Sequence, residues 1–170
     1  HGWMNSKLKY SVKPGSQGEL ILKGKAPLHV AHRSTEPLQV VYDESEHGEG
    51  TNFEIHLKVK AEGGTIGKTD SSLRVSDADV VTFYLSEATS FNGFDKSPGL
   101  DGKDPSALAA LNMDAGFKKD FGKLETSHIK DHSQLFHRVY IDLGKDPALL
   151  KLPLDHRMKR YNDGQADPGF

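Results

Sequence analysis

The sequence predicts a mainly β protein, an antiparallel β-sandwich followed by a long α-helix and a short return strand. Residues 53–60 alternate without a break between apolar and polar side chains. Strand-sized segments then recur between short polar turns up to about residue 95. After residue 105 the apolar period changes from 2 to 3.6, which indicates helix. The chain's 170 residues fit a single domain of ordinary size.

The strongest predicted strand spans residues 51–61. Four apolar residues alternate with polar ones there, namely Phe53, Ile55, Leu57 and Val59. This alternation indicates one buried face and one face in water, and it places His56 on the wet face. Gly63 and Gly64 follow, and two glycines supply the positive φ angles of a two-residue hairpin turn. We therefore expect a return strand at residues 65–68.

Further strands are expected from apolar segments bounded by turn residues. They lie at residues 7–13, 19–23, 38–42, 72–75 and 80–88. Strands of this length with short polar connections are typical of an antiparallel sandwich.

A loop at residues 90–105 leads into the helical part of the sequence. Asp104 is expected to cap a helix that has Pro105 in its first turn. Apolar and histidine side chains then share one face of a long amphipathic helix, namely Phe117, Phe121, Leu124, His128, His132, Leu135 and Val139. We expect this helix to be interrupted near Gly116.

The C-terminal part is expected to contain two short elements. Residues 139–143 alternate again and are ended by Gly144, which predicts a short strand returning to a sheet. Residues 154–161 are expected to form one or two helical turns.

Composition excludes several classes of function. The chain has 22 basic and 24 acidic residues and a net charge of −2, without the basic excess typical of a nucleic-acid binder. No segment has the ~18 consecutive apolar residues of a membrane span. Because cysteine is absent, neither a disulfide nor a thiolate metal site can form.

His128 and His132 lie four residues apart on the predicted helix, the spacing with which helical zinc sites begin. No third ligand follows from the sequence, and both residues lie within the apolar stripe. We therefore favour packing of the two imidazoles over metal binding.

Two loop segments have weak functional signals. Residues 43–47 are acidic and offer oxygen ligands for calcium, but they lack the spacing of a calcium loop, which favours a solvated turn. Residues 48–50 contain Gly-x-Gly without a third glycine, which favours a loop over a dinucleotide site.

The loop at residues 90–98 is the best candidate site, because it combines two aromatic rings with an amide, an acid and a base. The candidate substrate-binding residues are Phe91, Asn92, Phe94, Asp95 and Lys96. Aromatic faces can stack on sugar rings, and the polar groups can bond hydroxyls. The alternative is that the two phenylalanines close the end of the sandwich.

Residues 89–98 resemble the signature loop in the N-terminal domain of glycoside hydrolase family 95, the inverting α-L-fucosidases. The resemblance is collinear from about residue 7 to residue 170. It is also carried by residues 19–30, 50–53, 128–144, 152–158 and 163–170. The segment at 152–158 departs from the family pattern at Leu154 and His156.

The resemblance implies that the chain is the latter part of that N-terminal domain, a β-supersandwich, with its linker helix. Residues 1–98 would be the sandwich portion, 99–138 the loop and linker helix, and 139–170 the return strand and connection toward a catalytic helical barrel. In the family the barrel carries the acid and the water-activating residues, which would follow residue 170, so no catalytic residue is assigned. A sandwich without its earlier strands leaves sheet edges and apolar surface uncovered, which predicts association.

The implied function is that of a non-catalytic portion of an inverting exo-α-L-fucosidase acting on terminal fucose of glycans. Its partners would be fucosylated oligosaccharides and the helical barrel of the same parent chain, and the implied reaction needs no cofactor. The first residues form no export signal, but the family implies an exported parent protein. Two alternatives stay open, a carbohydrate-binding or scaffold module and an α-L-galactosidase specificity.

Overall fold

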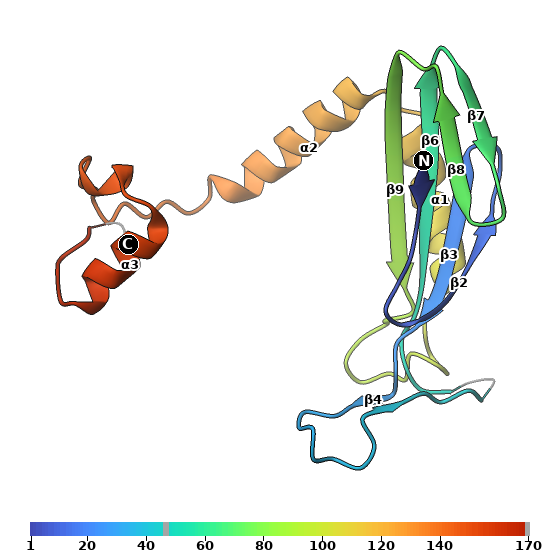
Figure 1. Ribbon diagram of the computed structural model, residues 1–170, viewed down its shortest axis with the longest axis horizontal. Helices are drawn as coiled ribbons and strands as arrows, with labels where there is room; N and C mark the ends of the chain where they lie inside the picture. The colour runs from blue at the N-terminus through green and yellow to red at the C-terminus, as the bar shows by residue number, and fades with distance from the viewer. Residues whose placement is uncertain (46–47, 169–170) are drawn as a thin grey trace. The chain divides into compact units, whose positions relative to one another are not determined.

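The structure is a computed structural model that describes residues 1–45 and 48–168. The chain divides into two units, His1–Phe121 and Gly122–Phe170, which are considered separately. The first holds the β-sheets and helix α1, and the second holds most of α2, the short helix η1 and helix α3 (Figure 1). No helix in the described ranges is long and apolar enough to cross a membrane.

Two antiparallel sheets form the first unit. The larger has the order β2-β3-β6-β9, with bounds Lys9–Pro14, Glu19–Lys25, Asn52–Glu62 and Val80–Thr89. The smaller has the order β1-β8-β7, with bounds Gly2–Trp3, Ser72–Ser76 and Thr65–Lys68. A separate pair, β4 (His29–Val30) and β5 (Val40–Val41), lies at the end of the larger sheet (Figure 1).

The two sheets pack face to face, which confirms the predicted sandwich. Leu20 of β3 and Val59 of β6 contact Leu73 of β8, and all three are buried. Partly buried side chains surround this cluster, namely Met4, Val12, Ile66 and Val75. We call the side of the larger sheet that bears Leu20 and Val59 its sandwich face.

Helix α1 (Pro105–Phe117) covers the opposite side of the larger sheet, which we call the helix face. The Ser86 hydroxyl donates to the Ala109 carbonyl at 2.9 Å, and the rings of Tyr84 and Phe117 pack in a T-shaped arrangement with their centroids 5.0 Å apart. The prediction that this side is in water is therefore wrong. The alternation in β6 is real, but the polar side lies beneath a helix.

The start of α1 agrees with the sequence prediction. The Asp104 side chain accepts from the amides of Ser106 at 2.9 Å and Ala107 at 3.3 Å, and Pro105 occupies the first turn.

The glycine turn after β6 has the expected conformation but a different role. Gly63 and Gly64 have φ angles of 71° and 65°. However, β7 does not return along β6. It pairs with β8 in the smaller sheet, and β6 pairs with β9. The predicted strand at residues 65–68 is confirmed, but its pairing with β6 is wrong, because residues 63–79 cross to the second sheet before the chain returns.

The predicted long helix is broken into α1 and α2 (Phe121–Phe136), close to the interruption expected at Gly116. The Lys119 amide donates to the Gly116 carbonyl at 3.0 Å, which tightens the last turn of α1. The Tyr84 hydroxyl donates to the Lys119 carbonyl at 3.1 Å and holds the chain there.

The predicted return strand at residues 139–143 is wrong. These residues form no strand, and the described part of the second unit offers none for them to pair with. An alternating segment becomes a strand only through a hydrogen-bonded neighbour. The predicted turns near residue 154 are confirmed as α3 (Leu154–Asn162), which follows η1 (Leu149–Lys151).

Leu73→Ala should lower the free energy of unfolding of the first unit by about 2–5 kcal/mol, because it leaves a cavity between the sheets. Leu38→Ala is the control, since Leu38 is largely exposed. Chemical denaturation followed by circular dichroism measures both. Equal losses for the two variants would contradict a core centred on Leu73.

Candidate functional site

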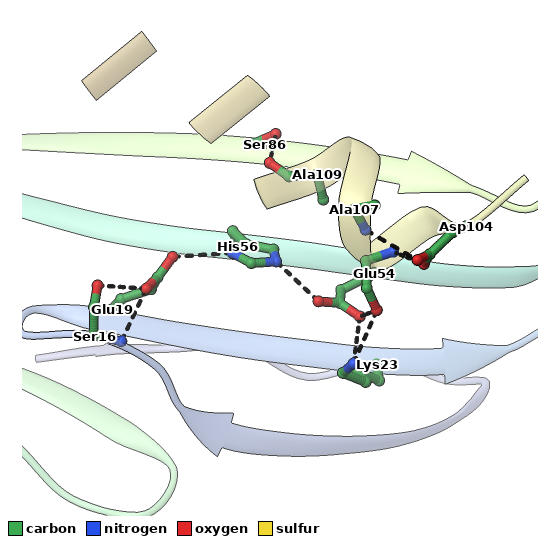
Figure 2. A network of polar contacts seen from close by, with 10 residues as sticks. Ser16, Glu19, Lys23, Glu54, His56, Ser86, Asp104, Ala107 and Ala109 are labelled. Atoms are coloured by element: carbon green, nitrogen blue, oxygen red, sulfur yellow. Dashed lines mark hydrogen bonds and ion pairs between the residues drawn. The ribbon is translucent and has the colours of Figure 1, made fainter. Parts of the chain in front are cut away.

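A buried row of charged side chains lies on the helix face of the larger sheet. His56 projects from β6 and is only 5% exposed, so its predicted place on a wet face is wrong. Glu54 lies two residues before it on the same strand, and Glu19 lies on the neighbouring strand β3. The register of these strands, with Ile21 opposite His56, brings both carboxylates to the imidazole (Figure 2).

His56 bridges the two carboxylates. Its Nδ1 lies 2.9 Å from Glu19 Oε1 and its Nε2 lies 2.9 Å from Glu54 Oε1. Ionised carboxylates only accept hydrogen bonds, so both ring nitrogens donate at once when the imidazole carries two protons.

Both ends of this row are tied to other elements. Glu19 accepts from the Ser16 amide at 2.9 Å and the Ser16 hydroxyl at 2.6 Å. Glu54 pairs with Lys23 Nζ at 2.9 Å and accepts from the Ser106 hydroxyl in the first turn of α1 (Figure 2). The row therefore fastens α1 to the sheet.

These contacts keep both carboxylates ionised. Burial raises the pKa of Glu19, but hydrogen bonds from Ser16 and His56 lower it by more, so its pKa lies below the ordinary 4.5. Burial likewise raises the pKa of Glu54, and hydrogen bonds from Lys23, Ser106 and His56 bring it below 4.5. Partners that favour the charged form outweigh desolvation at both sites.

The arrangement is structural rather than hydrolytic. In a serine hydrolase the hydroxyl bonds the imidazole, whereas Ser106 bonds the carboxylate of Glu54. A pair of glycosidase carboxylates must reach a sugar and a water, but Glu19 and Glu54 are buried and bonded to protein donors. Sequence reasoning missed this row. The sequence did contain a signal for it. Glu54 and His56 are two residues apart on one strand, so they share a face of the sheet, and the helix predicted after residue 105 must pack on one face of that sheet.

The predicted substrate loop lies at one end of the larger sheet. Phe94 is 98% exposed and Phe91 is also exposed, so closing the sandwich is not their role. Asp95 and Lys96 are exposed as well. The Asn92 side-chain amide donates to the Asp101 carbonyl at 2.8 Å, so this residue braces the loop. Substrate binding by the five residues stays a prediction.

The base of that loop is fixed to the sheet. Ser90 is buried, and its hydroxyl accepts from the Asn52 amide at 3.0 Å while its own amide donates to the Asn52 carbonyl. The Ser97 hydroxyl donates to Glu49 at 2.7 Å. The loop therefore has an anchored base and an exposed aromatic tip.

The acidic segment at residues 43–47 begins with a turn built on Asp43. The Asp43 carboxylate accepts from the Ser45 hydroxyl at 2.7 Å, from the Ser45 amide at 3.0 Å and from the Glu49 amide at 3.0 Å. The Ser45 bonds contribute most to holding the pKa of Asp43 below its ordinary value. Residues 46 and 47, which the calcium alternative includes, lie outside the described residues.

His128 and His132 are exposed on α2, with ring centroids 6.0 Å apart, and His132 stacks on Phe136 at 5.2 Å. Packing of the pair against another element stays a prediction. Among residues 1–45 and 48–168, no three histidine or acidic residues are grouped to hold a metal ion.

In the second unit, Arg157 of α3 donates two hydrogen bonds to the carboxylate of the buried Asp167, one of 2.9 Å from Nε and one of 2.7 Å from Nη2. The bidentate bond keeps the pKa of Asp167 below its ordinary value and fixes the segment that follows α3.

Residues 120–170 match the family described as glycosyl hydrolase family 95 catalytic domain. The match covers α2, η1 and α3, supports the resemblance to family 95, and suggests a glycoside hydrolase. The strands and α1 of the first unit lie outside the match. No curated protein matches the sequence.

The ion row should make stability depend on pH. Because the folded pKa of Glu54 lies below 4.5, its contribution is present above pH 4.5 and is lost as pH falls through the folded value. Glu54→Gln should cost about 1.5–3 kcal/mol of unfolding free energy at pH 7.

Denaturation of wild type and Glu54→Gln from pH 7 to pH 3 measures this effect, and the gap between them should shrink below pH 4.5. Glu62→Gln, an exposed position on the same strand, is the matched control. A gap that stays constant with pH would contradict an ionised Glu54.

Proposed function

We propose that this chain belongs to a family 95 glycoside hydrolase that removes terminal α-L-fucose from glycans with inversion at the anomeric carbon. The observation that carries the proposal is the match of residues 120–170 to the family's catalytic domain. The collinear resemblance of residues 7–119 supports it, because separate motifs occur in the family's order.

In this proposal the first unit is a non-catalytic part of the enzyme, which supports the catalytic domain and does not carry out the chemistry. Inverting hydrolysis needs one carboxylic acid to protonate the leaving oxygen and a base-activated water to attack from the other side. The two buried carboxylates of the first unit already bind His56 and cannot take these roles. The resemblance to the family places the acid and the base in the part of the catalytic domain that would follow residue 170.

The exposed tip of the substrate loop supports a contact with the sugar. Phe94 offers both faces of its ring at 98% exposure, and Asp95 and Lys96 beside it offer groups that bond hydroxyls. An anchored base fits a binding role, since less freedom is lost when the tip meets a ligand.

Hydrolysis of an aryl α-L-fucoside tests the activity. We expect turnover by a longer form of the protein that continues past residue 170, with β-L-fucose as the first product by NMR, and none by residues 1–170 alone. An aryl α-L-galactoside, which differs at C5 by a hydroxymethyl group, tests the related specificity. Heat of binding to fucosylated oligosaccharides by residues 1–170, with no turnover by the longer form, would instead favour a carbohydrate-binding module.

Phe94→Ala in that longer form should lower kcat/KM by up to about tenfold, because stacking on a ring contributes about 0.5–1.5 kcal/mol. Its unfolding free energy should not change, since the side chain is almost fully exposed. Leu100→Ala, at an exposed position of the same connection, is the control. Equal kcat/KM for wild type and Phe94→Ala would remove Phe94 from the sugar site.

A further inference from the structure

The outer edge of β9 has an unpaired row of backbone groups. The Val59 amide donates to the Gly18 carbonyl, so odd-numbered residues of β6 turn their backbone to β3 and even-numbered ones turn to β9. The bond from the Ser90 amide to the Asn52 carbonyl, 2.8 Å long, confirms that even-numbered residues of β9 turn to β6.

The remaining residues of β9 direct their N–H and C=O groups outward. They are Val81, Phe83, Leu85, Glu87 and Thr89. No hydrogen bond within the described part of the chain occupies these groups. The strand is ten residues long, so the open edge extends for roughly 33 Å.

Apolar side chains accompany the open edge. Phe83 and Leu85 stand on the sandwich face, opposite Val59 and Leu57 of β6, and are 56% and 64% exposed. The smaller sheet covers Val59, and Gly2 of its strand β1 lies beside the Phe83 ring, but Phe83 and Leu85 both stay more than half exposed. Open backbone and exposed apolar side chains thus occur on the same residues.

The strand at the other end of the sheet is protected against pairing. β2 carries Lys9, Lys13 and Pro14, and lysine and proline are the residues that commonly block edge-to-edge association. β9 contains neither lysine nor proline. Of the two end strands, β9 alone is suited to receive a further strand.

We propose that the further strand is β9 of a second copy of this chain, so that two copies form one continuous sheet across a two-fold axis. An antiparallel pairing centred on Leu85 sets Val81 opposite the partner's Thr89 and Phe83 opposite the partner's Glu87. Every outward-facing residue then meets an outward-facing residue, and the two Glu87 carboxylates do not oppose each other. This self-complementarity is what a two-fold interface requires.

The same axis brings further apolar groups together. It is perpendicular to the sheet, so Phe83 and Leu85 of both copies lie on one side.

Sedimentation equilibrium of the chain tests the proposal. We expect a mass that rises with concentration to twice the 18.7 kDa of one chain. A mass of one chain throughout the micromolar range would overturn it.

A matched pair of variants locates the interface. Leu85→Lys should give a monomer with an unchanged circular dichroism spectrum. Leu38→Lys makes the same substitution at a residue that is also 64% exposed, but away from β9, and should still dimerise. A dimer that survives Leu85→Lys, or that Leu38→Lys disrupts instead, would overturn the proposal.

Amide hydrogen exchange needs no variant and reads the pairing directly. The amides of Val81, Phe83, Leu85 and Glu87 should gain protection as concentration rises, while those of Thr82, Tyr84 and Ser86 are protected throughout. Protection of the first set in a monomer would mean that another segment occupies the edge and would likewise overturn the proposal.

Discussion

Pairing of charge beneath α1 is the constraint on which the first unit depends. A helix can cover a sheet face that bears two glutamates and a histidine only if each group finds a partner, because an unpaired buried charge costs several kcal/mol. The Glu19–His56–Glu54 row meets this need within the sheet, and Lys23 and Ser106 extend it to the helix. The Asp104 cap then fixes where α1 begins and the Tyr84 hydroxyl fixes where it ends.

Much of the fold follows from local sequence patterns. The structure differs from the sequence prediction where the outcome depends on elements that are distant in the chain. The alternation of β6, the cap at Asp104 and the conformation of Gly63 depend on a few adjacent residues and could be predicted. Whether the polar side of β6 faces water depends on a helix that begins more than forty residues later. The partner of β7 and the missing strand at residues 139–143 depend likewise on which edges the rest of the chain offers.

The candidate site shows the same division. Composition identified the loop at residues 90–98, because aromatic and hydrogen-bonding side chains are concentrated there. The sequence could not show that Asn92 bonds Asp101 whereas Phe94 lies in solvent, since these outcomes depend on how Ser90 and Asn52 join the loop to the sheet. The buried row escaped notice because Glu19 and His56 are 37 residues apart and meet only through strand register.

The crossing at Gly63 makes the β7–β8 pair of the smaller sheet an insertion between β6 and β9. Its two ends touch, because the Asp79 amide donates to the Glu62 carbonyl at 2.8 Å. A short hairpin closes with less loss of chain entropy than a distant pairing. We expect this hairpin to form early in folding and to bring Glu62 close to Val80, the first pair of the β6–β9 ladder. The remaining pairs of this ladder should then form in order from residue 62 toward residue 52.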